Sequence, residues 1–344
     1  MTAPLRSWFS LYDRLPAQVA RLLGVVFMVL ALYAVLMTNE NARKQGTQQT
    51  IAEDLGYFGL PTLGVGILII SGGIDLSIGS VVALGAVCFG LLVEKQTPPW
   101  EAALLVLAGS AAIGLVHGLL VTQLRLQPFL VTLCGLFIYR GVARWLSPEH
   151  SPGLNVADTP EAFQKQVATF RSLLVGSMPI GEKYRIPHQL LLLLLVAVIL
   201  GLFLHGTRYG RYLYAIGANE EAARYAGIAT DRYKVVSYII CSALAGLSSL
   251  VFINYNDTVS PTSGGSWLEL YAITGAVLGG CSLRGGEGSA PGMVLGAAVL
   301  PVLRQLCYSV NIRSELEYAV IGAALLVGTI IDEFLKRRRA ARVG

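Results

Sequence analysis

Residues 71–80 read SGGIDLSIGS, a short stretch of glycines and serines around one carboxylate, Asp75. Both flanks are apolar: LGYFGLPTLGVGILII ends at Ile70, and VVALGAVCFGLLV ends at Val93. A charge at the centre of a bilayer costs roughly 2.5–3.5 kcal/mol on insertion scales, so charged residues inside membrane segments usually have a structural or functional role. The stretch therefore predicts a membrane helix that is interrupted rather than continuous.

The composition of the whole chain is that of a membrane protein. Of its 344 residues, 54% are hydrophobic and only 14% are charged, whereas soluble domains carry about 25% charged residues. An apolar run of about 20 residues crosses the bilayer core, and only helices and closed barrels satisfy their backbone there. The runs are too long for barrel strands. We therefore expect an all-α, polytopic membrane helical bundle of about ten spans, near residues 20–38, 55–71, 76–94, 99–124, 128–147, 188–206, 234–254, 267–280, 291–310 and 317–335.

The basic residues indicate how this bundle is oriented. Cytoplasmic segments of membrane proteins are enriched in Lys and Arg, and with ten spans these residues gather in the two ends of the chain and in segment 207–234. We expect both termini and this segment in the cytoplasm, and the loop 148–187 outside. The net charge of +5 follows from this distribution and requires no nucleic acid partner. Arginines precede the first run as in a signal peptide, but no small-x-small cleavage site follows, so we expect an uncleaved first span.

Several chemical functions lack their motifs in this chain. There is no G-x-x-x-x-G-K-[ST], G-x-S-x-G or H-E-x-x-H, so the sequence offers no frame for ATP hydrolysis, acyl transfer or zinc proteolysis. The cysteines are scattered, odd in number and without metal-ligand spacing: Cys88, Cys134, Cys241, Cys281 and Cys307. We expect neither an enzyme nor a metal or cofactor bound by this chain.

The chain is organised as one domain, 1–344, with two related halves near 20–147 and 188–335. Each half contains a glycine-interrupted membrane segment, SGGIDLSIGS in the first and TGAVLGGCSLRGGEGSAPG, 274–292, in the second. We expect broken helices near 71–80 and 279–290. Paired short or broken hydrophobic segments indicate a transport pathway, although glycine also serves plain helix packing in membranes.

Two readings of the first break stay open together. Gly72 and Gly73 can end one helix in a left-handed cap, and Asp75 can be the N-cap of the next, accepting the amide of Ser77 or Ile78. Alternatively, Asp75 and Ser77 face a polar cavity and contact a passing solute. The readings are compatible, because broken helices are permitted where they line a cavity.

A second motif, YAIGANEEAARYAGI at 214–228, predicts a short helix in the cytoplasmic segment. Asn219 suits its N-cap, acidic residues suit its first turn, and Gly227 suits its end. Seven residues, EEAARYA, are too few for a helix that is stable alone in water. It should therefore dock on its own bundle or on a partner protein, using a face of small side chains. Its candidate residues are Gly217, Asn219, Glu220, Ala222, Ala223, Ala226 and Gly227.

Four further polar residues are candidates for the pathway. His117 lies in a span between two glycines, Asn254 ends a span, and Trp267 and Glu269 begin the short apolar run of the second half. Each has an equally simple structural role as a packing, capping or interface residue. We interpret three residues at the outer end of one span as interface anchors: Arg140, Arg144 and Trp145.

These motifs resemble the permease subunits of bacterial ABC sugar importers of the ribose, xylose and arabinose type. The matching stretches are SGGIDLSIGSVVALGA, QPFLVTLCGLFIYRGVA, YAIGANEEAARYAGI and LELYAITGAVLGGCSLRGGEGS, which cover most of residues 55–330. The resemblance implies a multi-pass protein of the bacterial inner membrane that pairs with a second copy or a homologue. It also implies two cytoplasmic subunits that bind ATP and magnesium, and an external solute-binding protein that delivers the sugar. By the same resemblance, the helix after Asn219 is the coupling helix that inserts into the ATPase.

Departures from the family pattern leave the sugar itself open. The family often has Asn where this chain has His117, Gly for Cys134, Asp for Tyr271 and a basic residue for Glu287. The alternative function is a secondary carrier or channel that moves a small polar solute without ATPase partners. Co-purification with an ATP-binding protein would separate the two functions.

Overall fold

The computed structural model describes residues 17–180 and 184–313, with a few single positions between 316 and 326. This part of the chain is mainly helical. Its helices are α2 (Ala17–Leu36), α3 (Gln45–Ile70), α4 (Ile78–Glu94), α5 (Pro99–Thr122), α6 (Pro128–Leu146), α7 (Glu161–Val175), α8 (His188–Gly206), α9 (Arg208–Ala218), α10 (Glu220–Tyr225), α11 (Thr230–Asn256), α12 (Leu268–Leu278) and α13 (Ala290–Ser309). One small antiparallel hairpin joins β1 (Ser177–Ile180) to β2 (Tyr184–Pro187), with Ser177 opposite Pro187.

The expected all-α membrane bundle is confirmed. Within the described residues, six helices are long and apolar enough to cross a membrane: α3, α5, α6, α8, α11 and α13. Three shorter apolar helices, Leu22–Leu36, α4 and α12, occupy the positions of three other predicted spans. The tenth predicted span, 317–335, lies almost wholly outside the described residues.

Both predicted breaks follow the same type of helix end. After α3, Gly72 has φ 80°, its amide binds the Ile69 carbonyl at 2.9 Å, and the Gly73 amide binds the Leu68 carbonyl at 2.9 Å. After α12, Gly280 has φ 94°, and the amides of Gly280 and Cys281 bind the carbonyls of Val277 and Ala276. Each end is a Schellman motif, which places glycine where a side chain would be strained.

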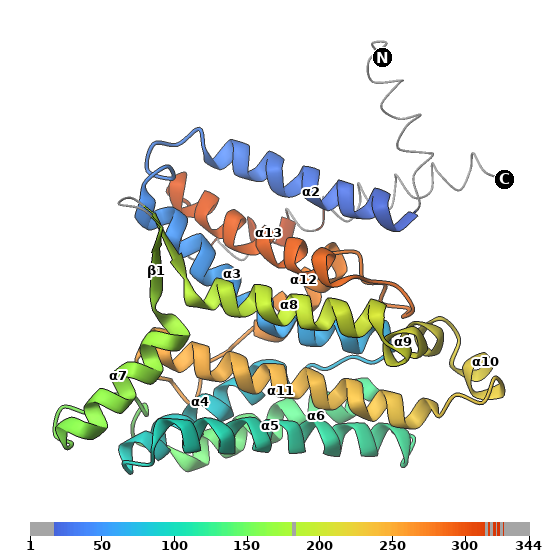
Figure 1. Cartoon of the computed structure of the whole chain (residues 1–344), viewed down its shortest axis with the longest axis horizontal. Helices are drawn as coiled ribbons and strands as arrows, with labels where there is room; N and C mark the ends of the chain where they lie inside the picture. Colours follow the sequence, from blue (N-terminus) through green and yellow to red (C-terminus); the bar gives the residue numbers. More distant parts are fainter. Residues whose placement is uncertain are drawn as a thin grey trace.

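The long helices run side by side in layers (Figure 1), with α3 and α11 at the centre. Of the most apolar window of α3, 78% is buried within the chain, against 61% for α11 and 22% for α6 and α8. Because α6 and α8 keep most of their apolar side chains on the outside, they form the periphery of the bundle.

Small residues bring α5 against α11. A Cβ on Gly114 would lie 2.4 Å from the Tyr238 carbonyl, and one on Gly118 would lie 2.8 Å from the Cα of Val235. The two backbones can therefore approach closely only because glycine occupies these positions, as is common between membrane helices.

The two ends of the bundle differ. At one end, α7 packs Phe163, Val167 and Phe170 against the ends of α4 and α5, and Arg171 forms an ion pair with Asp257 at 2.6 Å. At the opposite end lie α9 and α10 (Figure 1). The helix α7 is 15 residues long and lies within the loop 148–187.

Candidate functional site

The first break places Asp75 in the interior of the protein. Its side chain is fully buried, and its Oδ1 accepts the Ser77 amide at 2.8 Å and the Ser77 hydroxyl at 2.6 Å. The helix α4 begins at Ile78 with Ser77 as its N-cap. The prediction that Asp75 is the N-cap residue is therefore wrong by two positions, because the chain makes an extra turn closed by the Asp75 carboxylate. Its predicted contact with the Ser77 amide is present.

The second carboxylate oxygen of Asp75 points toward His117 on α5. Asp75 Oδ2 and His117 Nδ1 are 3.7 Å apart, and neither atom has a hydrogen-bond partner in the described part of the chain. The other ring nitrogen of His117 lies 2.9 Å from the hydroxyl of Tyr139 on α6. Tyr238 on α11 meets the His117 ring edge-on at 6.4 Å. Three helices thus converge on the break and bring Asp75, Ser77 and His117 together.

Glu269 lies at the other end of this region, in the first turn of α12. Its carboxylate lies against the backbone of Gly79 in the first turn of α4, where a Cβ would be 2.2 Å from Glu269 Oε2. A carboxylate at this place satisfies free amides and interacts favourably with the positive helix end. Glu269 therefore caps a helix from another part of the chain.

Arg140 on α6 corrects another prediction. Its guanidinium is half-buried, donates to the Gly264 carbonyl and interacts electrostatically with Glu269. It is turned inward and is not an interface anchor, whereas Trp145 is 77% exposed. The sequence signal that we missed is an arginine six residues before the end of an apolar span, a place where charges usually have partners.

Two predicted pathway residues do not join this group. Asn254 is fully buried, but its amide donates to Leu250 in its own helix at 2.8 Å. Trp267 is 56% exposed and is the N-cap of α12, with φ 67°. Trp267 fits the capping role that was left open for it. Asn254 lies inside α11, and its Oδ1 has no hydrogen-bond partner among the described residues, so its role stays a prediction.

The short helix α10 has the predicted ends. The Asn219 side chain accepts the Ala222 amide at 2.9 Å, which confirms it as the N-cap. Gly227 has φ 84°, and the Ile228 amide binds the Ala223 carbonyl in a third Schellman motif. The helix itself, Glu220–Tyr225, is six residues long, one fewer than predicted.

One of the three alanines predicted to form an exposed face on α10 is buried instead. Ala223 is only 5% exposed and faces its own chain, whereas Ala222 and Ala226 are exposed. Successive helical residues are about 100° apart, so Ala222 and Ala226 share a face and Ala223 points elsewhere. Tyr225, next to that outer face, is 92% exposed.

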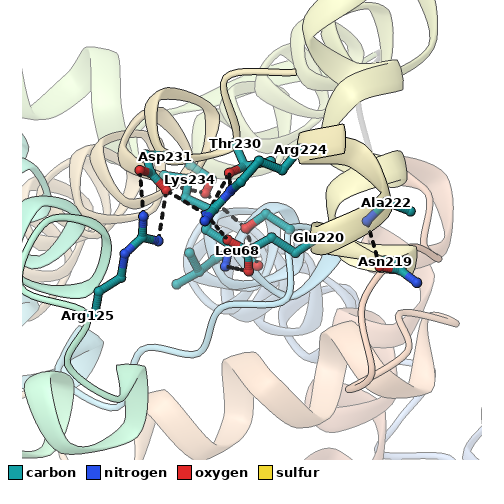
Figure 2. A network of polar contacts seen from close by, with 11 residues as sticks. Leu68, Arg125, Asn219, Glu220, Ala222, Arg224, Thr230, Asp231 and Lys234 are labelled. Atoms are coloured by element: carbon teal, nitrogen blue, oxygen red, sulfur yellow. Dashed lines mark hydrogen bonds and ion pairs between the residues drawn. The ribbon is translucent and has the colours of Figure 1, made fainter. Parts of the chain in front are cut away.

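Charged side chains attach α10 to the bundle (Figure 2). Glu220 pairs with Lys234 on α11 and with Arg224 at 3.2 Å. Arg224 also reaches Asp231 at 3.3 Å, and Arg125 from the α5–α6 turn binds Asp231 through two hydrogen bonds of 3.1 and 3.0 Å. The network joins α10 to α11 and to the α5–α6 turn.

Gly217, near the end of α9, touches both breaks. A Cβ there would lie 1.9 Å from the Ile70 carbonyl and 2.3 Å from the Gly286 amide, and these two groups are hydrogen-bonded at 2.9 Å. On the same helix, the Tyr214 hydroxyl donates to the Gly288 carbonyl at 2.8 Å, and burial raises the pKa of Tyr214 to about 12. The segment that leads into α10 is therefore packed against both breaks.

Comparison with known proteins shows which family the sequence matches. Residues 49–328 match the family described as branched-chain amino acid transport system / permease component. The chain is 33% identical over 314 residues to a probable ABC transporter permease protein of Sinorhizobium fredii, covering 91% of this chain and 89% of the relative. It is 33% identical over 270 residues to a ribose import permease protein of Escherichia coli, covering 78% and 80%. A fructose import permease protein of Bifidobacterium longum is 31% identical over 285 residues, covering 81% and 80%. The resemblance seen in the motifs is confirmed.

Proposed function

Because the chain belongs to the family of branched-chain amino acid transport system permease components, we propose that it forms the membrane pathway of an ATP-driven sugar importer in a bacterial inner membrane. Relatives named as ribose and fructose import permeases, each matched over about four-fifths of its length, support a sugar as the substrate. The observation that carries the ATP-driven mechanism is the capped helix α10, which presents Tyr225 and the Ala222–Ala226 face at one end of the bundle.

In this proposal the chain itself supplies no ATPase. Two cytoplasmic subunits bind ATP and magnesium and receive α10, and both termini lie on their side of the membrane. A second copy or a homologue completes the pathway, and an external solute-binding protein docks over the loop 148–187. The sugar passes the polar region around Asp75, Ser77 and His117, where hydroxyl, carboxylate and imidazole groups can exchange hydrogen bonds with it.

A branched-chain amino acid is the second candidate substrate, favoured by the description of the family. An amino acid carries both charges, and the neighbouring Arg140 and Glu269 offer one group of each sign. These two side chains already interact with each other and with backbone groups, however, so a zwitterion would have to displace those contacts. A neutral sugar carries no charges that need these two partners, so it can pass without displacing those contacts. We therefore favour a sugar as the substrate.

Uptake by reconstituted vesicles tests the proposal. Vesicles with the chain, its ATPase subunits and the solute-binding protein should accumulate labelled ribose or another sugar only with ATP, and should not accumulate leucine. Ala222→Glu, on the exposed face of α10, should abolish uptake at normal expression, because a charge would be buried in the contact with the ATPase. Ala223→Glu is a poor probe, since Ala223 is buried within this chain.

Gln45→Glu is the matched control, because it adds the same charge at an exposed residue at the start of α3, outside both α10 and the loop 148–187, and it should leave uptake unchanged. ATP-independent uptake by the chain alone would establish the secondary carrier or channel instead. Normal uptake by Ala222→Glu would disprove the role of α10.

A further inference from the structure

The first two turns of α11 touch both the α10 network and the first break. At Lys234, the ammonium group pairs with Glu220 of α10. One turn later, the Ser237 hydroxyl lies 2.8 Å from the Lys234 carbonyl and 3.0 Å from the hydroxyl of Ser71, the residue that ends α3. Ser71 in turn donates to the Leu68 carbonyl at 2.7 Å. Figure 2 shows the charged network and Leu68 close together at this end of the bundle.

The two serine hydroxyls form a hydrogen bond with each other, which joins the end of α3 to α11. They do not bind only the carbonyl groups of their own helices. Both side chains are almost completely buried, at 1% exposed for Ser71 and 0% for Ser237. If each proton went to the carbonyl of its own helix, the two oxygens would face each other at 3.0 Å without a proton between them. One hydroxyl therefore donates to the other, and such a bond is electrostatically stronger in a dry interior than in water.

Ser71 is well placed to move Asp75. It lies directly before the glycines at 72 and 73, which have no side chains to hold the chain in place. Gly72 already adopts a left-handed conformation. Only three residues separate Ser71 from Asp75, and Tyr238, the neighbour of Ser237, lies with its hydroxyl 3.5 Å from the Ile74 carbonyl. A shift of α11 along its axis is thus passed to the segment 71–77 at both of these places.

We propose that Lys234, Ser237 and Ser71 are positioning residues that link the position of α10 to the conformation of the first break. This inference rests on the proposed function, because it gives the route by which a bound ATPase would act on the pathway. The Lys234 side chain holds α10, the helical backbone carries its movement over one turn, and the serine pair passes the movement to the segment that holds Asp75.

Hydrogen exchange on the purified chain tests the link without any ATPase. The backbone amides of 71–77 should exchange about five-fold faster in Glu220→Gln, since weakening one hydrogen bond to a charged or buried group changes a local opening equilibrium by about that factor. Glu221→Gln is the matched control. Glu221 is the next residue on the same helix turn and is exposed, so its substitution should leave the exchange of 71–77 unchanged.

A double variant shows whether the effect passes through the serine pair. In a Ser237→Ala background, Glu220→Gln should add nothing to the exchange of 71–77, because non-additivity is the sign of a shared interaction. Ser248→Ala is the control background, as Ser248 is equally buried on the same helix and its hydroxyl has no partner among the described residues. There the five-fold effect should persist. Equal exchange in Glu220→Gln and the wild type, or an undiminished effect in the Ser237→Ala background, would overturn the proposal.

Transport per ATP is a second and separate measurement. In the full complex, Ser71→Ala and Ser237→Ala should each lower the number of sugars moved per ATP about five-fold, and the double variant should lose no more than either single variant. An unchanged ratio in both single variants contradicts the link. If the wild type itself shows no ATP-dependent uptake, the proposed function fails, whereas the exchange experiment still decides the link.

Discussion

At the scale of single residues, Asp75 uses its two carboxylate oxygens differently. Oδ1 holds the Ser77 amide and hydroxyl, and Oδ2 faces His117 Nδ1 at 3.7 Å. In Asp75→Ala the buried Ser77 groups lose their acceptor, so we expect the free energy of unfolding to fall by about 1–3 kcal/mol. Asp75→Asn keeps the Oδ1 acceptor and can donate to His117, so its loss should stay below about 1 kcal/mol. Thermal unfolding in detergent measures both, and equal losses would mean that the negative charge itself is required.

Gly217 gives a second prediction at this scale. Gly217→Ala should cost at least about 2–3 kcal/mol, since its Cβ would push the Ile70 carbonyl and the Gly286 amide apart and a buried overlap has no room to relax. Gly206→Ala is the matched control, because nothing lies within 4 Å of a Cβ there, and in a helix alanine is favoured over glycine by about 0.5–1 kcal/mol. The same unfolding measurement should order them Gly206→Ala, wild type, Gly217→Ala, from most to least stable. Similar stability of the two variants would contradict the close contact at Gly217.

The sequence predicts residues whose role is local and misses those whose role depends on distant segments. The cap at Asn219 and the left-handed Gly72 and Gly227 were predictable because a cap or a turn involves only neighbours in the chain. The inward direction of Arg140 was not, because its partners Gly264 and Glu269 lie more than a hundred positions later. The orientation of Ala223 depends on a bundle surface that no local pattern encodes.

At the scale of elements, α4 begins without a cap from its own first residues. Its N-cap Ser77 makes no capping bond with its side chain, and the carboxylate of Glu269 from α12 lies against Gly79 instead. Glu269→Gln should therefore lower the free energy of unfolding by about 0.5–1 kcal/mol, through the loss of a negative charge at a helix N-terminus.

Glu101→Gln is the comparison for this prediction, since Glu101 also lies in a first helical turn, that of α5, but is exposed. Its effect should be smaller because water screens the interaction. Unfolding of both variants in detergent at fixed salt measures the difference. A larger loss for Glu101→Gln would show that Glu269 does not stabilise α4.

The lengths of the elements show what hydropathy detects. The predicted span 55–71 is the apolar part of α3, but the helix begins ten residues earlier with the polar segment QGTQQTIAED, 45–54. Hydropathy reports which part of a helix lies at the apolar depth of the membrane, whether it contacts lipid or other helices, and a helix can continue beyond that depth. The short α12 was predicted within two residues at each end, because Trp267 and the glycines at 279 and 280 bound it on both sides.

At the scale of the whole molecule, the bundle has two unlike ends. One carries α10, Tyr225 and a set of basic residues: Arg125, Arg208, Arg211, Arg224, Arg232 and Lys234. The other carries α7 and the hairpin (Figure 1). Basic residues beside membrane spans favour the cytoplasmic side. The proposed mechanism requires the same orientation, since only cytoplasmic subunits have access to ATP.

Labelling of single cysteines decides this orientation. In a Cys134→Ser background, which removes the cysteine that is exposed among the described residues, Tyr225→Cys and Glu161→Cys each add one exposed thiol at opposite ends of the bundle. A membrane-impermeant thiol reagent should label Glu161→Cys in intact cells and Tyr225→Cys only in inverted vesicles. The background protein should stay unlabelled in both, because its other described cysteines are buried or half-buried. Labelling of Tyr225→Cys in intact cells would place α10 outside, beyond the reach of any cytoplasmic ATPase, and the mechanism would then have to be that of a carrier or channel.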